Sequence, residues 1–188
     1  MDEIKDQLRQ SRQEMLDKWN RVLPTNELLN DRWEKAKFLG FGEGTSVYDS
    51  CMILGNVTVG KNCWIGPFTL LDGSGGLTIG DGCDISTGVQ IYSHDTVDRV
   101  LTEGKANIEY TKTIIGKNCH IGAGSIVLKG LSIGHHSVVG AGCVVTKSFP
   151  AYSVIMGVPG KRVGRIELSE DGVEFIYDQK HKDKEGKE

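Results

Sequence analysis

The chain has 188 residues and a formal net charge of −3, a balance that gives no basic face of the kind that binds nucleic acid. No stretch approaches the roughly 18–20 apolar residues that a membrane span requires, and the N-terminus lacks the apolar segment of a signal peptide, so we expect a cytoplasmic protein. The 25 glycines are many for a globular chain, but they recur at regular positions, which argues against a disordered low-complexity tract.

Residues 1–40 do not repeat and predict an N-terminal helical segment. A broken amphipathic helix is predicted from the apolar residues Ile4, Leu8, Met15, Trp19, Val22 and Leu23, and Pro24 ends this helix. A second helix is expected from a cap at Thr25 or Asn26 to about Phe38. We expect the two helices to cover the open end of the repeat that follows, with substrate selection as the alternative role.

Residues 41–149 form the main domain, in which aliphatic residues recur at a spacing of six. The series reads Val47, Ile53, Val59, Ile65, Leu71, Ile79, Ile85, Ile91, Ile115, Ile121, Val127, Ile133, Val139 and Val145. Each hexad predicts a short strand and a tight turn, and three hexads close one coil. Coils stacked about 4.8 Å apart pair their backbone amides, so the fourteen hexads predict four to five coils around an apolar axis.

The residue before each aliphatic position should point outward, and every third hexad shares a face, which predicts three outward columns. The apolar column contains Met52, Leu70, Gln90, Ile126 and Val144. A more polar column contains Thr58, Thr78, Ile114 and Ser132. The third column contains Trp64, Asp84, His120 and Val138, a mixture that suits a face beside a ligand groove. The apolar column predicts a contact with a partner, with cover by the N-terminal helices as the alternative.

Five cysteines each follow an aliphatic residue of the series by four positions, which is the small inward slot of the hexad. They are Cys51, Cys63, Cys83, Cys119 and Cys143. The chain contains no CxxC pair, and a free cysteine behaves as a compact apolar residue in a core. We therefore expect core cysteines rather than a zinc site, a disulfide or a cysteine nucleophile.

The hexads fail at about 93–113, where a loop of some twenty residues leaves the coil. Long loops in compact domains are usually functional. A C-terminal extension is expected over 150–178, in which Arg165–Leu168 and Val173–Tyr177 form a hairpin. Residues 179–188 are charged and nearly free of apolar side chains, so a disordered tail is expected.

In the repeated pattern an aliphatic residue is followed directly by glycine and, four positions after the aliphatic residue, by a small residue. This pattern is the signature of a known family. From about Val47 to Val163 the chain resembles the left-handed parallel β-helix acyltransferases of the hexapeptide-repeat family, including sugar and polysaccharide O-acetyltransferases and the galactoside, maltose and xenobiotic acetyltransferases. Residues 144–150 and 157–161 resemble the closing segments of these enzymes. The resemblance implies an all-β left-handed parallel β-helix, a homotrimer, and acetyl-CoA as co-substrate without a metal.

His94 is the candidate catalytic residue. Acyl transfer from a thioester to a hydroxyl needs a base near neutral pKa, and an unperturbed imidazole has a pKa of about 6.5. His94 lies three residues after Ile91, where the loop begins, and the resemblance places the family's catalytic histidine there. The alternative is a polar loop residue without a chemical role.

Coenzyme A needs an approachable backbone for its pantetheine arm and cations for its phosphates. Small residues and cations gather in the late coils, and the resemblance implies contacts from Ala123, Ala141, Thr146, Lys147 and Lys161, beside which Arg162 adds a cation. The alternative for Lys147 and Lys161 is an ordinary exposed charge. The candidates for contacts with the substrate are Trp64, Asp84, Asp95 and His120.

These observations predict an acetyltransferase that acts on a hydroxyl of a sugar or a surface-polysaccharide precursor. One alternative is an N-acetyltransferase for an amino sugar, a nucleotide-linked amino sugar or an antibiotic, and another is a non-catalytic β-helix scaffold. The γ-class carbonic anhydrases share the coil, but Ser125 stands where their zinc site needs a histidine five residues after His120. The N-terminal helices do not match those of the galactoside and maltose enzymes, so the sugar-binding residues of those enzymes do not carry over.

Overall fold

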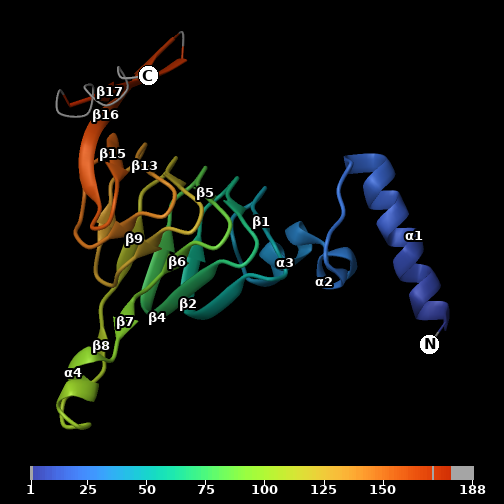
Figure 1. Ribbon diagram of the computed structural model, residues 1–188, viewed down its shortest axis with the longest axis horizontal. Coiled ribbons are helices and arrows are strands. Elements are labelled where there is room, and N and C mark those ends of the chain that lie inside the picture. The colour runs from blue at the N-terminus through green and yellow to red at the C-terminus, as the bar shows by residue number, and fades with distance from the viewer. Residues whose placement is uncertain (1, 171, 179–188) are drawn as a thin grey trace, which may run out of the picture.

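The structure is a computed structural model that describes residues 2–170 and 172–178, and its main part is a β-solenoid of stacked coils (Figure 1). One face is a column of parallel strands: β1 (Ser46–Val47), β3 (Trp64–Ile65), β5 (Asp84–Ile85), β10 (His120–Ile121), β13 (Val138–Val139) and β15 (Ser153–Met156). These six strands mark about six coils, more than the four to five expected from the hexads. The additional strand, β15, pairs with β13 beyond Phe149, where the regular spacing of six ends.

The other two faces share the long strands β2 (Met52–Val59) and β4 (Leu70–Ile79), which pair with each other in parallel. The second face continues with β6 (Gln90–Ile91), β11 (Ile126–Val127) and β14 (Val144–Val145), and the third with β9 (Thr113–Ile115) and β12 (Ser132–Ile133). Ile126 pairs with Gln90 and with Val144, and Ser132 pairs with Ile114. The three outward columns predicted from the spacing are confirmed, because the phase of the repeat survives the loop.

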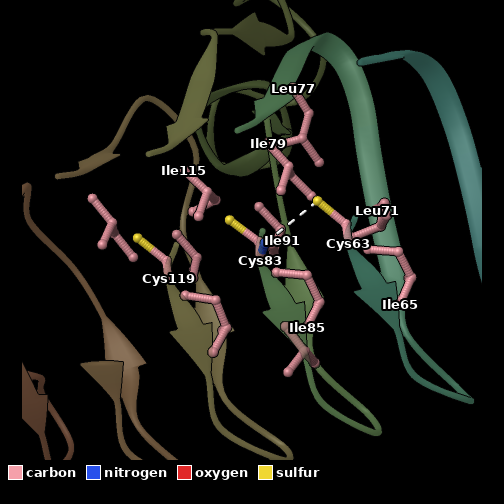
Figure 2. Close-up of a cluster of buried hydrophobic side chains, with 14 of the residues drawn as sticks. Cys63, Ile65, Leu71, Leu77, Ile79, Cys83, Ile85, Ile91, Ile115 and Cys119 are labelled. Atoms are coloured by element: carbon pink, nitrogen blue, oxygen red, sulfur yellow. Dashed lines mark hydrogen bonds between the residues drawn. The ribbon is translucent and has the colours of Figure 1, made fainter. Parts of the chain in front are cut away.

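The axis of the solenoid is filled by the aliphatic series together with the cysteines (Figure 2). Ile65, Ile85 and Ile121 have no exposed surface, and all five cysteines are buried free thiols, as predicted. The Sγ of Cys63 donates to the carbonyl oxygen of Gly80 at 3.1 Å, and Cys83 donates in the same way to Gly116. Each of these thiols therefore packs as an apolar group and also satisfies a carbonyl of the adjacent coil.

The coils approach each other so closely at their turns that a side chain would not fit. A Cβ atom at Gly134 would lie 2.1 Å from the backbone nitrogen of Ala151. Other turn positions need a left-handed backbone, which Asn62 and Asn118 supply with φ of +54° each. The stacking thus requires glycine at close contacts such as that of Gly134, and the left-handed turn positions favour asparagine or glycine.

The N-terminal segment forms three helices, α1 (Asp2–Trp19), α2 (Thr25–Leu29) and α3 (Arg32–Phe38). The expected second helix is divided because Asp31 caps α3, its carboxylate accepting from the amides of Trp33 and Glu34 at 2.8 and 2.9 Å. No residue of α1 is buried, and Figure 1 shows α1 away from the stack.

The first coil is closed by α2 and α3. Ala36 of α3 joins the core cluster, and the Nζ of Lys35 donates to the carbonyl oxygens of Tyr48 and Asp49 at 3.0 and 2.7 Å. The buried carboxylate of Glu27 in α2 accepts from the amide of Asp49. These two side chains bond to backbone groups of the turn that follows β1 and so join α2 and α3 to the first coil, as a cap over an open end must.

Two hairpins leave the solenoid. The expected loop folds into an arm, defined here as residues 94–110, with β7 (His94–Asp95), the helix α4 (Val97–Leu101) and β8 (Glu109–Tyr110), and it projects from the side of the stack (Figure 1). At the C-terminal end, β16 (Lys161–Ser169) pairs antiparallel with β15 and with β17 (Gly172–Tyr177), which confirms the predicted hairpin. The predicted tail, 179–188, lies outside the described residues. No described helix is long and apolar enough to cross a membrane.

Candidate active site

A groove of about 520 Å³ lies between the arm and the later coils. Its lining residues are Tyr92, His94, Asp95, Thr96, Val97, Leu128, Lys129, Leu131 and Thr146. Apolar side chains with a few convergent polar groups are typical of a small-molecule site. The groove brings together three residues singled out from the sequence, His94, Asp95 and Thr146.

A buried carboxylate holds the imidazole of His94. The Nδ1 atom of His94 lies 2.6 Å from Oδ2 of Asp72. Asp72 has no exposed surface, whereas 30% of the His94 side chain is exposed. Because an ionised carboxylate can only accept hydrogen bonds, Nδ1 carries the hydrogen of this pair, and in the neutral imidazole Nε2 is then the nitrogen with the free lone pair. The imidazole is therefore arranged to accept a proton at Nε2.

Asp72 is kept ionised by its surroundings. Its Oδ2 accepts from the amide of Ser93 at 2.8 Å, and its Oδ1 accepts from the amide of Ser74 at 3.0 Å. Burial alone would raise the pKa of Asp72, but hydrogen bonds from Ser74, Ser93 and His94 outweigh it and hold that pKa well below the usual range. A permanent negative charge thus lies against the ring edge of His94.

The coil register creates this pair. Leu71 of β4 pairs with Ile91 of β6, so Asp72, which directly follows Leu71, lies one coil before the residues that open the arm. The sequence patterns did not single out Asp72. The sequence did contain a feature that could have identified it: Asp72 is an acidic residue beside the two-residue insertion over 73–76, one coil before His94. Only the side-chain packing shows that its carboxylate turns toward His94.

Tyr110 covers a face of the same imidazole. His94 and Tyr110 are paired across the two strands of the arm, and their rings stack with centroids 5.9 Å apart and planes 24° apart. The hairpin is closed at its base by the amide of Thr111, which donates to the carbonyl oxygen of Ser93 at 2.8 Å. The position of His94 therefore depends on Asp72 at its edge and on the arm at its face.

The residues predicted to contact coenzyme A lie in several places. Thr146 lines the groove, and the neighbouring Lys147 is exposed with its Nζ 5.7 Å from the Phe149 ring centroid. Ala123 and Ala141 are exposed in stacked turns at another corner, where the amide of Gly142 donates to the carbonyl oxygen of Ala123. Lys161 and Arg162 are exposed at the start of β16. Within one chain, only Thr146 of this set shares the groove with His94.

The predicted substrate residues other than Asp95 lie on a different face. Trp64, Asp84 and His120 are direct neighbours in the column from β3 to β10, and His120 Nδ1 lies 3.8 Å from Asp84 Oδ1. Trp64 also borders a second hollow of about 470 Å³ between the N-terminal helices and the first coils. One chain thus does not bring this column to His94. In the described ranges, 2–170 and 172–178, no group of three or more His, Cys, Asp or Glu residues is arranged to hold a metal ion.

Comparison with known proteins relates the chain to transferases. The model of the hexapeptide repeat of succinyl-transferase matches residues 56–93 and 112–147. The serine acetyltransferase of Buchnera aphidicola subsp. Schizaphis graminum is 34% identical over 105 residues, which cover 56% of this chain and 39% of the relative. The dTDP-4-amino-4,6-dideoxy-D-glucose acyltransferase of Escherichia coli is 29% identical over 145 residues, 69% of this chain and 76% of the relative. The chain spans about half the length of several curated relatives, such as 51% of the Mycobacterium tuberculosis serine acetyltransferase.

Solved structures show the same fold. AntD, an N-acyltransferase from Bacillus cereus in complex with dTDP and 3-hydroxybutyryl-CoA, superposes with a TM-score of 0.60 at 25% identity, over 77% of this chain and 76% of AntD. A galactoside acetyltransferase in complex with coenzyme A has a TM-score of 0.50 at 23% identity, over 84% of this chain and 82% of that chain. The solenoid is therefore shared with proteins that were solved with a coenzyme A species bound.

Proposed function

We propose that this chain, which matches the model of the hexapeptide repeat of succinyl-transferase over residues 56–93 and 112–147, transfers an acetyl group from acetyl-CoA to a hydroxyl of a sugar or a surface-polysaccharide precursor, with His94 as general base. The observation that carries this proposal is the contact of 2.6 Å between His94 and the buried Asp72, at the wall of a groove. A base held in one tautomer suits a hydroxyl, which must lose its proton as it attacks.

The proposed chemistry is a direct transfer. The acceptor O–H gives its proton to Nε2 of His94 while its oxygen attacks the thioester carbonyl carbon. The tetrahedral intermediate collapses as the C–S bond breaks, and the imidazolium returns the proton to the leaving thiolate. Asp72 stabilises the imidazolium through Nδ1, as a carboxylate does in other base-activated sites. The five cysteines are buried, so none of them is exposed to take up the acetyl group as an acyl-enzyme, which favours the direct route.

Coenzyme A is assigned to the later coils in this proposal. Thr146 lies in the groove with His94, which suits the thioester end of the coenzyme. Ala123 and Ala141 leave turn backbone open beside the pantetheine arm, and the exposed cations Lys147, Lys161 and Arg162 suit its phosphates. Weaker binding of acetyl-CoA to Lys147→Ala and Lys161→Ala proteins would support these assignments.

A homotrimer would complete the site. The apolar column is only partly covered within one chain, with Met52 58% exposed at its start. We assign this column to the contact between subunits, so that the column of Trp64, Asp84 and His120 of one subunit meets the groove of the next. These three residues then act as substrate contacts, although they lie away from His94 of their own chain.

A second candidate is N-acylation of a nucleotide-linked amino sugar. It is favoured by the E. coli relative named for a dTDP-linked amino sugar and by AntD, which was solved with dTDP. An amine that is already partly deprotonated depends less on a base than a hydroxyl does. The response of each reaction to loss of His94 therefore separates the two candidates.

The test is release of coenzyme A from acetyl-CoA across a panel of sugars, nucleotide sugars, amino sugars, amino acids and aminoglycosides. We expect turnover with a hydroxyl acceptor, and we expect the His94→Ala protein to lose it. Turnover only with amines, insensitive to His94→Ala, would overturn the O-acetyltransferase in favour of the second candidate. Absence of turnover with the whole panel, together with no binding of coenzyme A, would favour a non-catalytic scaffold.

A further inference from the structure

Three charged side chains meet where the arm joins the solenoid. The Nζ of Lys129 lies 3.2 Å from a carboxylate oxygen of Asp95 and also contacts the carboxylate of Glu109. Asp95 belongs to β7 and Glu109 to β8, whereas Lys129 follows β11 in the next coil. Only 18% of the Lys129 side chain is exposed. One lysine thus ties both strands of the arm to the body of the protein.

The two strands need this cation. Asp95 and Glu109 stand directly opposite each other in the antiparallel pair, and like charges in that position repel. The ladder has only two residue pairs, too few to hold a hairpin together in water. Hydrogen bonds to the carboxylates raise the pKa of Lys129, the bond to Glu109 more than the bond to Asp95, as expected for an ammonium group between two carboxylates.

The other pair of this ladder is His94 with Tyr110. A separation of β7 from β8 would therefore also disturb the stack on the imidazole and the direction of the ring toward Asp72. We propose that Lys129 is a positioning residue, which clamps the two strands of the arm and thereby holds His94 in its reactive place. This inference rests on the proposed function for its kinetic consequence, but not for its structural one.

The test replaces Lys129 by methionine, which keeps the length of the chain and removes the charge. In the Lys129→Met protein we expect faster hydrogen exchange at the amide of Thr111, which closes the hairpin, and shifted ring-proton NMR resonances of His94. With an accepted substrate, kcat should fall about 10- to 100-fold, the cost of a misplaced catalytic group. KM for acetyl-CoA and the melting temperature should change little.

Two rescue variants and one control sharpen the test. Lys129→Arg should keep kcat, because the charge is kept. Adding Glu109→Gln to Lys129→Met should restore part of it, because the repulsion between the two acids disappears. Lys105→Met is the control, since Lys105 lies on the same arm, is exposed and makes no ion pair with any described residue.

Unchanged exchange at Thr111 and unchanged His94 resonances in Lys129→Met would overturn the clamp, whatever the activity. Faster exchange with wild-type kcat would overturn the positioning role. Failure of the proposed function is recognised separately, because it appears as unaltered transfer in His94→Ala, and the exchange and NMR measurements then still decide whether Lys129 holds the arm.

Discussion

Replacement of Asp72 by asparagine tests the site most directly, because the side chain keeps its shape and loses its charge. The Asp72 carboxylate accepts from four donors: the amide of Ser74 at Oδ1, and the amide of Ser93, the hydroxyl of Ser93 and the ring of His94 at Oδ2. In the Asp72→Asn protein the side-chain NH₂ group takes the place of one of these two oxygens and then faces a backbone N–H, whichever way the amide is turned. At least one donor therefore loses its acceptor, and the ring of His94 loses its negative partner.

The expected loss in catalysis is large. A positioned base contributes about 10²–10⁴-fold to the rate, so His94→Ala should lower kcat by that factor. Asp72→Asn should lower kcat by about 10²-fold or more, since the imidazolium loses its counter-charge and the tautomer is no longer enforced. The buried donor left without an acceptor should cost about 1–3 kcal/mol of unfolding free energy.

The assay is steady-state release of coenzyme A as a function of acceptor and of acetyl-CoA, together with thermal unfolding. KM for acetyl-CoA should remain close to that of the wild type in both variants, because neither side chain is assigned to the coenzyme. Asp98→Asn serves as the control, because Asp98 is an exposed carboxylate in α4 of the same arm.

Two outcomes would refute this role of Asp72. A folded Asp72→Asn protein with wild-type kcat on the true acceptor would show that the carboxylate does not act through His94. If Asp72→Asn lowered the melting temperature and the activity, but kcat per folded molecule equalled that of the wild type, Asp72 would be a structural residue only.

The charges and the packing give three further predictions. The folded-state pKa of Asp72 lies below its unfolded value of about 3.9. Its contribution to stability is therefore present above about pH 4 and is lost as the pH falls toward the folded pKa. The free energy of unfolding in urea should accordingly fall less between neutral and acid pH in Asp72→Asn than in the wild type. Leu70→Glu with Ile126→Glu should give monomers of low activity, and a trimer still seen by light scattering would exclude this column as the interface. Cys83→Ala should lower the unfolding free energy by about 1 kcal/mol with kcat retained, whereas a loss of turnover at an unchanged melting temperature would contradict a purely structural cysteine.

The sequence by itself determined the solenoid and its columns. Hydrogen bonds between coils align each hexad with the one below, so a spacing of six is enough to predict that Ile126 stands beside Gln90 and that Cys83 lies inside. The same regularity, with the resemblance to known transferases, singled out His94. It undercounted the coils, because β15 lies beyond Phe149, where the spacing is no longer six.

Only the tertiary structure decided what surrounds His94. Asp72 is 22 residues away in the chain, and Lys129 is 20 residues beyond Glu109, so neither contact is visible in a local pattern. The Asp72 carboxylate meets the arm across one coil, and the arm folds back because Lys129 relieves the repulsion between two acids. The hexad repeat carries no information about these contacts, since they depend on side chains that meet across coils where the repeat is interrupted.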